Sequence, residues 1–237
     1  MEELRNLYRH RQLIATLTAR DLKARYRGSV LGYFWSLANP LLLLGVYTLV
    51  FTRFFDRPGI SPYPLFLFAG ILPWTFFSTA VLESTTAISS NAGLIKKVLF
   101  PAEALPLVVV FSHLVHFILA LPILFFAILI AALVPDAPHA PGVATAATSW
   151  VILLAPLIML LQTLFVAGFA LMVSSASVLF RDLRDIVANL LQLGFFLTPV
   201  LYLVDDVDSR VLRLLLRLNP MTPFVSSYQR IFFFGTA

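Results

Sequence analysis

The sequence contains no cysteine, which excludes disulfide bonds, thiolate metal sites and cysteine nucleophiles. Charge is scarce as well, because only 12% of the 237 residues are charged, against roughly 25% in soluble domains. Lysine stands only at positions 23, 96 and 97, and none of the three completes the glycine-rich pattern with which a P-loop holds phosphates. The chain is therefore not expected to bind nucleotide by itself, and no catalytic residue is assigned to it.

Apolar residues are abundant, at 59% of the sequence, and the mean hydropathy is +0.90. No charged residue occurs between Gly28 and Arg53, and a helix of that length crosses a hydrocarbon core about 30 Å thick. These features predict an all-α integral membrane protein. The start of the chain is too polar for a cleavable signal peptide, so the first span is expected to remain as an anchor.

The net charge of +5 is concentrated at the start of the chain, since seven of the 17 cations precede residue 28. Lysine and arginine beside a span are retained on the cytoplasmic side, so a multi-pass protein of the cytoplasmic (inner) membrane with a cytoplasmic N-terminus is expected. Nucleic acid would also bind such a basic block, but a basic segment beside a long apolar run is more often held by anionic lipid. We therefore expect contact with membrane lipid and none with nucleic acid.

Five membrane spans are expected, which together form one transmembrane domain over residues 1–237. The spans cover residues 31–52, 64–89, 104–132, 148–176 and 186–204. Residues 91–103 are expected to form an inner loop, because a lysine pair lies within them. Residues 206–234 contain apolar pieces too short to span. They are expected to form two short re-entrant or interfacial helices on the outer side, separated at Asn219-Pro220.

Residues 4–27 are expected to form an amphipathic helix that lies in the membrane interface. Its apolar face is formed by Leu4, Leu7, Tyr8, Ile14, Ala15, Leu22 and Tyr26. Leu13 and Leu17 lie off this face and are expected to touch a partner instead. The cations of the interface helix are Arg20, Lys23, Arg25 and Arg27. They are expected to face lipid phosphates or a partner protein, and a solvated basic helix without a partner is the alternative.

Glu83 is the only carboxylate inside an expected span. A charge there is costly, so Glu83 is expected to be paired or to face a cavity, with His113 or His116 as the candidate partner. A glutamate that extends to the inner interface is the alternative. The two histidines are three residues apart and share a helix face. Because no third ligand lies near them in the sequence, no metal site is expected.

Asp182 and Asp185 are spaced so that both carboxylates can hold Mg²⁺ for phosphate chemistry. An arginine stands next to each of them, so a solvated loop that pairs its own charges is favoured. Two alternatives to a transport subunit remain from these residues. One is an integral-membrane enzyme that acts on polyprenyl-phosphate lipids through the two aspartates. The other is an ion-coupled carrier that uses Glu83 and His113.

Several stretches, taken together, resemble the membrane subunit of type-2 ABC exporters, in the branch that moves O-antigen, teichoic acid and capsular polysaccharides. The stretches are RDLKARYRGSVLGYFWSLANPLLLLGVYTLVF at 20–51, YPLFLFAGILPWTFFS at 63–78, NAGLIKKVLFPAEALPL at 91–107, SASVLFRDLRDIV at 175–187, TPVLY at 198–202 and NPMTPFVSSYQRIFFFG at 219–235. They cover nearly the whole chain in the family's order, and their combination is specific. The resemblance also implies a sixth span after the last stretch, which is absent from this sequence.

The resemblance implies a homodimer of permeases that works with two cytoplasmic ATP-binding cassette subunits. Those subunits would hold the ATP and magnesium, and this chain would carry no cofactor. The substrate would be a lipid-linked glycan that moves outward across the bacterial cytoplasmic membrane. The interface helix and a short coupling helix would contact the ATPases. The coupling helix consists of Leu94, Ile95, Lys96, Lys97, Val98, Leu99 and Phe100. The residues expected to line the substrate path are Tyr33, Trp35, Glu83 and His113.

Overall fold

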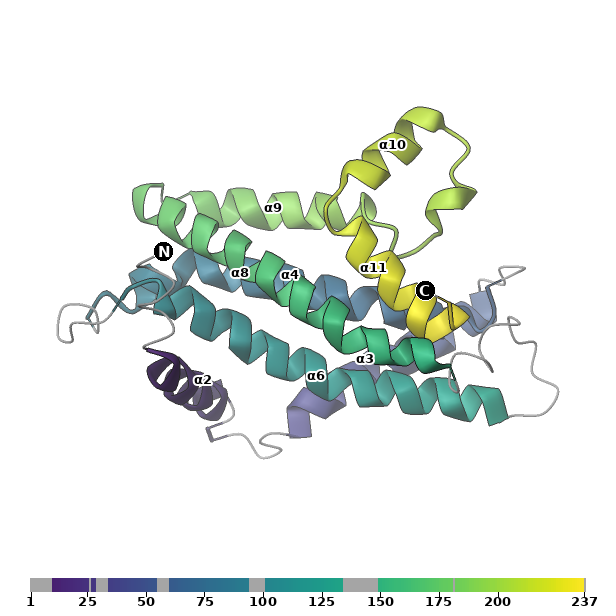
Figure 1. Cartoon of the computed structure of the whole chain (residues 1–237), viewed down its shortest axis with the longest axis horizontal. Coiled ribbons are helices and arrows are strands. Elements are labelled where there is room, and N and C mark those ends of the chain that lie inside the picture. Colours follow the sequence, from purple (N-terminus) through teal and green to yellow (C-terminus); the bar gives the residue numbers. More distant parts are fainter. Residues whose placement is uncertain are drawn as a thin grey trace. The chain divides into compact units, whose positions relative to one another are not determined.

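The computed structural model describes residues 10–25, 27–28, 34–54, 60–93, 101–133, 149–180 and 182–236. Every regular element within these ranges is helical, which confirms the all-α prediction for the described part of the chain (Figure 1). The α-helices are α2 (Arg11–Arg25), α3 (Trp35–Phe54), α4 (Tyr63–Ser90), α6 (Ala104–Leu133), α8 (Ala155–Leu179), α9 (Leu183–Phe196), α10 (Arg210–Leu218) and α11 (Thr222–Gln229). The shorter elements are the 3-10 turns η2 (Trp150–Leu154) and η3 (Val204–Asp206) and the π-helical turn η4 (Arg230–Phe234).

Three helices in the described ranges are long and apolar enough to cross a membrane: α4, α6 and the continuous segment Trp150–Leu179. They match three of the five expected spans. Within α3, the apolar part Trp35–Phe51 is shorter than these. Large aliphatic side chains remain exposed on the long helices, among them Leu153 and Leu164. Exposed apolar surface of this kind is typical of contact with a membrane or another protein.

The prediction of a membrane span over residues 186–204 is wrong for its second half, which is not α-helical. Helix α9 ends at Phe196 after 14 residues, a length of about 21 Å that falls short of the roughly 30 Å of a hydrocarbon core. The chain then turns, because Pro199 has no N–H with which to continue a helix. The amide of Gln229 binds the carbonyl oxygens of this turn, with Nε2 3.1 Å from Pro199 O and 3.3 Å from Val200 O.

The chain divides into two compact units. The first unit comprises Met1–Tyr33, Phe76–His116 and Thr163–Leu191, and the second comprises Phe34–Thr75, Phe117–Gln162 and Gln192–Ala237.

In the first unit, α2 packs against the beginning of α6. Ile14 of α2 is buried together with Ala104 and Val108 of α6, and Leu17 packs against this cluster. Leu17, which was expected to lie off the apolar face and to touch a partner, packs against α6 of its own unit, and Ala15 of the expected lipid-facing side is exposed. The face of α2 that packs against α6 is formed by residues 14, 17 and 18, of which the last two lie one helical turn after the first. This face coincides only in part with the apolar face expected from the sequence.

In the second unit, α11 and η4 belong to the buried core. Tyr228, Ile231 and Phe233 are almost completely buried. The ring of Tyr228 lies edge-on to Phe117 of α6 at 5.4 Å, and Phe233 lies edge-on to Phe66 of α4 at 5.6 Å. The expected pair of short helices is present, but the second of them is a core element of its unit. Its burial stabilises the unit through the large apolar area that each ring removes from solvent.

The break between α10 and α11 is held by side-chain hydrogen bonds. Asn219 Nδ2 donates to Leu197 O and to Thr198 Oγ1, both at 2.9 Å. Asn219 Oδ1 accepts from the backbone N–H of Met221 at 2.9 Å. These bonds satisfy backbone groups that a continuous helix would pair internally. The turn at Asn219-Pro220 is thus fixed by the hydrogen bonds of the Asn219 side chain.

Gly70 of α4 allows the turn after α9 to approach the helix closely. A methyl group at this position would lie 2.7 Å from Gln229 Nε2 and 3.2 Å from Val200 O. Gln229 is 2% exposed, so its amide has no free space into which to move. We expect Gly70→Ala to reduce the free energy of unfolding by about 1–3 kcal/mol, through crowding and the loss of buried hydrogen bonds. Thermal unfolding of the purified protein in detergent measures this change.

Gly168 of α8 offers a matched control, because a methyl group there would meet no atom within 4 Å. Alanine has the higher helix propensity, so Gly168→Ala is expected to leave the unfolding temperature unchanged or to raise it. A Gly70→Ala protein that unfolds at or above the wild-type temperature would contradict this account of the packing.

Candidate functional site

One face of α2 changes from apolar to ionic along its length. Ile14, Thr18, Asp21 and Arg25 follow one another at spacings of four, three and four residues, so their side chains share a single helix face. Ile14 and Thr18 are buried, and the Thr18 hydroxyl donates to Ile14 O at 2.8 Å. The same face therefore attaches α2 to its unit by apolar packing at its start and by charge at its end.

Arg25 joins two carboxylates. Its Nε donates to Asp21 Oδ2 at 2.9 Å, and its Nη1 donates to Glu83 Oε1 at 3.0 Å. Its Nη2 donates to the second oxygen of Glu83, so the guanidinium binds that carboxylate in the two-pronged geometry that arginine favours. The hydrogen bonds to Glu83 raise the pKa of Arg25 above its ordinary value, and the guanidinium is charged at physiological pH.

Glu83 also contacts the imidazole of His113. Glu83 Oε2 lies 3.0 Å from His113 Nε2, and Thr79 Oγ1 lies 3.2 Å from His113 Nδ1. The prediction that Glu83 pairs with a histidine of the third span is thus confirmed for His113. The Nδ1 of His116 lies 2.8 Å from Ser112 O, one turn earlier in its own helix.

The cluster of Asp21, Arg25, Glu83 and His113 connects α2 to α4 and α6 within the first unit. The side chain of Glu83 is 43% exposed, so its attraction to Arg25 is partly screened by solvent. Removing one partner leaves a charge beside apolar helices, which costs more than the pair itself contributes. The cluster therefore makes the attachment of α2 depend on the charges at the end of its inner face.

Metal binding by Asp182 and Asp185 is an alternative that the sequence raises. No group of three or more His, Asp or Glu side chains gathers as a metal site in the part of the chain that the structure describes. Asp182 and Asp185 are both exposed at the start of α9, where negative charge favours the helix N-terminus. That position provides a structural role for the two aspartates.

The other site residues inferred from the sequence are not members of this cluster, and some of them lie outside the described ranges. Arg20, Lys23 and Arg27 are exposed. Trp35 begins α3 in the second unit and is 39% exposed. Residues 94–100 and residue 33 lie outside the described residues.

Arg25 was grouped in the sequence with three exposed cations, and its bond to Glu83 was missed. Its i, i+4 spacing from Asp21 was the available signal, because such a pair lies on one face and orients the guanidinium. Glu83 is 58 positions further along the chain. No local pattern predicts a contact over that separation.

The ionic attachment of α2 can be tested by a double-mutant cycle with Arg25→Gln and Glu83→Gln. Each single change is expected to destabilise the protein, and the double change should cost less than the sum of the two, with a coupling of about 1 kcal/mol for a partly exposed pair. Hydrogen exchange of the α2 amides is expected to rise in both single variants. Arg20→Gln, which removes an exposed cation from the same helix, is the control; equal exchange in Arg20→Gln and Arg25→Gln would contradict the attachment.

Comparison with known proteins adds an independent line of evidence. The family model for ABC-2 type transporters matches residues 12–233. The chain is 41% identical over 231 residues to the O-antigen export system permease protein RfbA of Myxococcus xanthus, an alignment that covers 97% of this chain and 84% of the relative. An RfbA of Klebsiella pneumoniae is 32% identical over 224 residues, which are 94% of this chain and 81% of the relative.

A shorter similarity is found to the polysialic acid transport protein KpsM of Escherichia coli, with 34% identity over 85 residues, 34% of this chain and 32% of the relative. The family match includes α2, all the long helices and the C-terminal core segment. On that match, the chain belongs to the ABC-2 type transporter family.

Proposed function

We propose that this chain is the membrane-spanning permease subunit of an ATP-driven exporter. Its substrate is a lipid-linked polysaccharide of the O-antigen, capsule or teichoic acid type, which moves outward across the bacterial cytoplasmic membrane. The observation that carries this proposal is the 41% identity, over 97% of the chain, to a protein named as an O-antigen export permease. The three long apolar helices support it, because a permease must be embedded in lipid.

The energy source is proposed to lie on partner chains. The sequence has no P-loop, so two cytoplasmic ATP-binding cassette subunits would bind ATP and magnesium, and two copies of this chain would form the conduit. Contact with those subunits is assigned to residues 94–100 and to the exposed cations of α2. A lysine pair flanked on both sides by aliphatic residues offers both apolar contact and charge to a groove of a partner.

The ionic cluster gives a physical route from α2 into the membrane helices of its unit. A displacement of α2 moves Arg25, and Arg25 holds both oxygens of Glu83 in α4, which in turn contacts His113 in α6. ATP on the partner can drive such a displacement only if the nucleotide-bound partner prefers a different position of α2. Under this proposal the cluster transmits movement, and the place of Glu83 and His113 on the substrate path is a second role for the same residues.

An ion-coupled carrier is the second candidate, because a carboxylate and an imidazole lie 3.0 Å apart inside two apolar helices. The bond between Arg25 and Glu83 disfavours this role, since a guanidinium on both oxygens hinders the uptake and release of protons by the carboxylate.

Reconstitution separates the two candidates. In proteoliposomes that contain the permease, its ATPase subunits and a lipid-linked polysaccharide, we expect the glycan to become accessible on the opposite side only when ATP and magnesium are supplied to the ATPases. Permease alone under a proton gradient is the control and should move none. Transport by the permease without its ATPase, at a comparable rate, would reject the exporter in favour of the carrier.

Trp35 offers a test of the proposed substrate path. Its ring is 39% exposed at the start of α3, and an aromatic face contributes about 1 kcal/mol to a packed contact, which is several-fold in a rate or an affinity. Trp35→Ala is expected to slow export several-fold in the same vesicles. The matched control is Phe34→Ala, since the neighbouring Phe34 is also an exposed aromatic residue. An equal effect of the two changes, or normal export by Trp35→Ala, would remove Trp35 from the path.

A further inference from the structure

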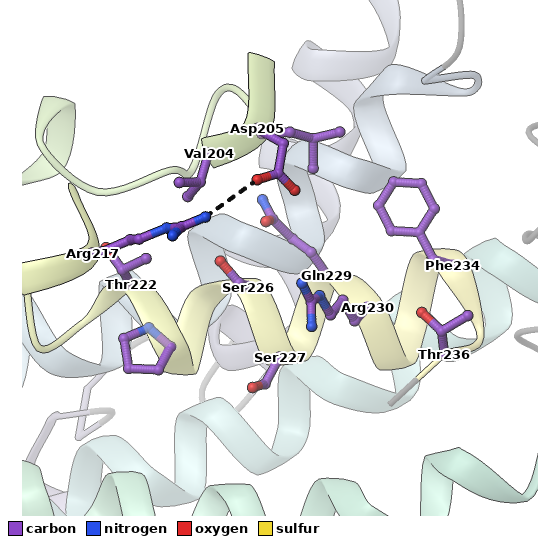
Figure 2. Close-up of a pocket in the computed structure, with 12 residues that line it drawn as sticks. Val204, Asp205, Arg217, Thr222, Ser226, Ser227, Gln229, Arg230, Phe234 and Thr236 are labelled. Carbon is purple, nitrogen blue, oxygen red and sulfur yellow. Dashed lines mark ion pairs between the residues drawn. The ribbon is translucent and has the colours of Figure 1, made fainter. Parts of the chain in front are cut away.

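The second unit contains a cavity of about 520 Å³ beside α11 (Figure 2). Its size falls within the roughly 300–1,000 Å³ of small-molecule sites. Its lining is contributed by residues around η3, by the end of α10, and by α11 with the turn that follows it. The lining residues are Leu203, Val204, Asp205, Arg217, Thr222, Pro223, Ser226, Ser227, Gln229, Arg230, Phe234 and Thr236.

The polar groups of this cavity include both donors and acceptors. The guanidinium of Arg217 lies 3.8 Å from Asp205 Oδ1, and both side chains are largely exposed. Ser226 and Gln229 extend from α11 towards this pair (Figure 2). A pair so long and so exposed contributes little to stability. Its groups are therefore available to a ligand at small cost to the fold.

Two further features favour a ligand. Within the described residues, Arg230 is exposed and has no acidic partner. Gln229, in contrast, is 2% exposed and is fixed by its bonds to Pro199 O and Val200 O. The cavity thus combines a wall that is already rigid with an exposed cation for which no ion pair is found among the described residues. Rigid walls lower the entropic cost of binding.

The mixture of groups indicates the chemistry of the ligand. A hydroxyl group donates and accepts hydrogen bonds, so a sugar can pair with guanidinium, carboxylate and hydroxyl side chains at once. A phosphate accepts only, and Asp205 would repel it. A lipid chain would leave the polar wall of Arg217, Ser226 and Arg230 unsatisfied, which is costly. The apolar ring of Phe234 in the same lining suits the C–H face of a sugar ring.

We propose that this cavity is a saccharide-binding subsite that holds a sugar unit of the exported glycan. The inference rests on the proposed function, because the glycan is the only saccharide that the exporter is proposed to handle. Arg230 and Arg217 bind sugar hydroxyl oxygens, Asp205 accepts from sugar hydroxyl groups, and the fixed Gln229 shapes the wall beside them. The subsite gives the permease direct contact with the glycan itself, apart from its lipid anchor.

Binding can be measured on the complete exporter, permease with its ATPases, in lipid nanodiscs. The probe is a set of short oligosaccharides released by mild acid from the surface polysaccharide of the cells that carry this exporter. Arg230→Gln is expected to weaken binding about tenfold, the factor that corresponds to one lost hydrogen bond to a charged group. Arg210→Gln is the matched control, because Arg210 lies on α10 but outside the lining, and it should bind as the wild type does.

A labelling experiment gives a second readout that does not depend on the folding of the arginine variant. The chain has no native cysteine, so Ser226→Cys introduces a single reactive thiol into the cavity. The oligosaccharides are expected to slow its reaction with a maleimide several-fold. Asp208→Cys, exposed and outside the lining, should react at the same rate with and without them.

Failure of this inference is distinguishable from failure of the proposed function. If the wild-type complex exports polysaccharide but the oligosaccharides neither bind nor protect Ser226→Cys, the subsite is rejected and the exporter stands. If inorganic phosphate protects the thiol and the oligosaccharides do not, the cavity is an anion site and the proposal is overturned. If the wild-type complex exports no glycan under ATP, the proposed function itself falls, and the subsite falls with it.

Discussion

The lack of water in the bilayer core is the constraint on which the structure of this chain depends. Every polar group placed there must find its partner within the protein. Several hydroxyl side chains in the long helices do so locally, as Ser84 Oγ donates to Ala80 O and Ser175 Oγ donates to Leu171 O. Between helices, Gln162 of α8 donates to the carbonyl oxygen of Pro73 in α4 at 2.8 Å. The same rule thus produces both self-contained helices and specific ties between them.

The carboxylate of Glu83 cannot be paired within its own helix, because it needs a cation and α4 contains none. The cation comes from α2, an element that is not itself long enough or apolar enough to span. This explains why the packed face of α2 begins with the apolar Ile14 and ends with the charged Asp21 and Arg25. A charge that is unfavourable in α4 alone becomes the group that fixes a separate helix. The interface helix is therefore part of the fold of the first unit as well as a surface for partners.

The parts of the fold that could be predicted from the sequence are those set by composition over a long window. The helices α4 and α6 follow from length and hydropathy alone, and the pairing of Glu83 with His113 follows from the cost of an isolated charge. The parts that could not be predicted are set by contacts between distant positions. The end of α9 at Phe196 depends on a turn held by Gln229, and the packing of the partly buried Leu17 depends on α6. Neither contact can be predicted from hydropathy, since the apolar run after Phe196 continues past the turn.

The C-terminal region is the clearest case in which contacts between distant positions decide the structure. Helices α10 and α11 are both short, and both were expected as re-entrant segments on the outer side. Leu212 and Leu215 of α10 are exposed, whereas Val225 and Tyr228 of α11 are buried. The difference arises at Asn219, whose hydrogen bonds to Leu197 O and Thr198 Oγ1 turn the chain so that α11 enters the core. A buried helix beside an exposed one leaves polar side chains of α11, such as Ser226, at the boundary between them, and the cavity forms there. The cavity therefore offers hydroxyl, amide and guanidinium groups on a rigid support. The cluster of the first unit, in contrast, is a salt bridge whose strength depends on how far solvent is excluded from Glu83.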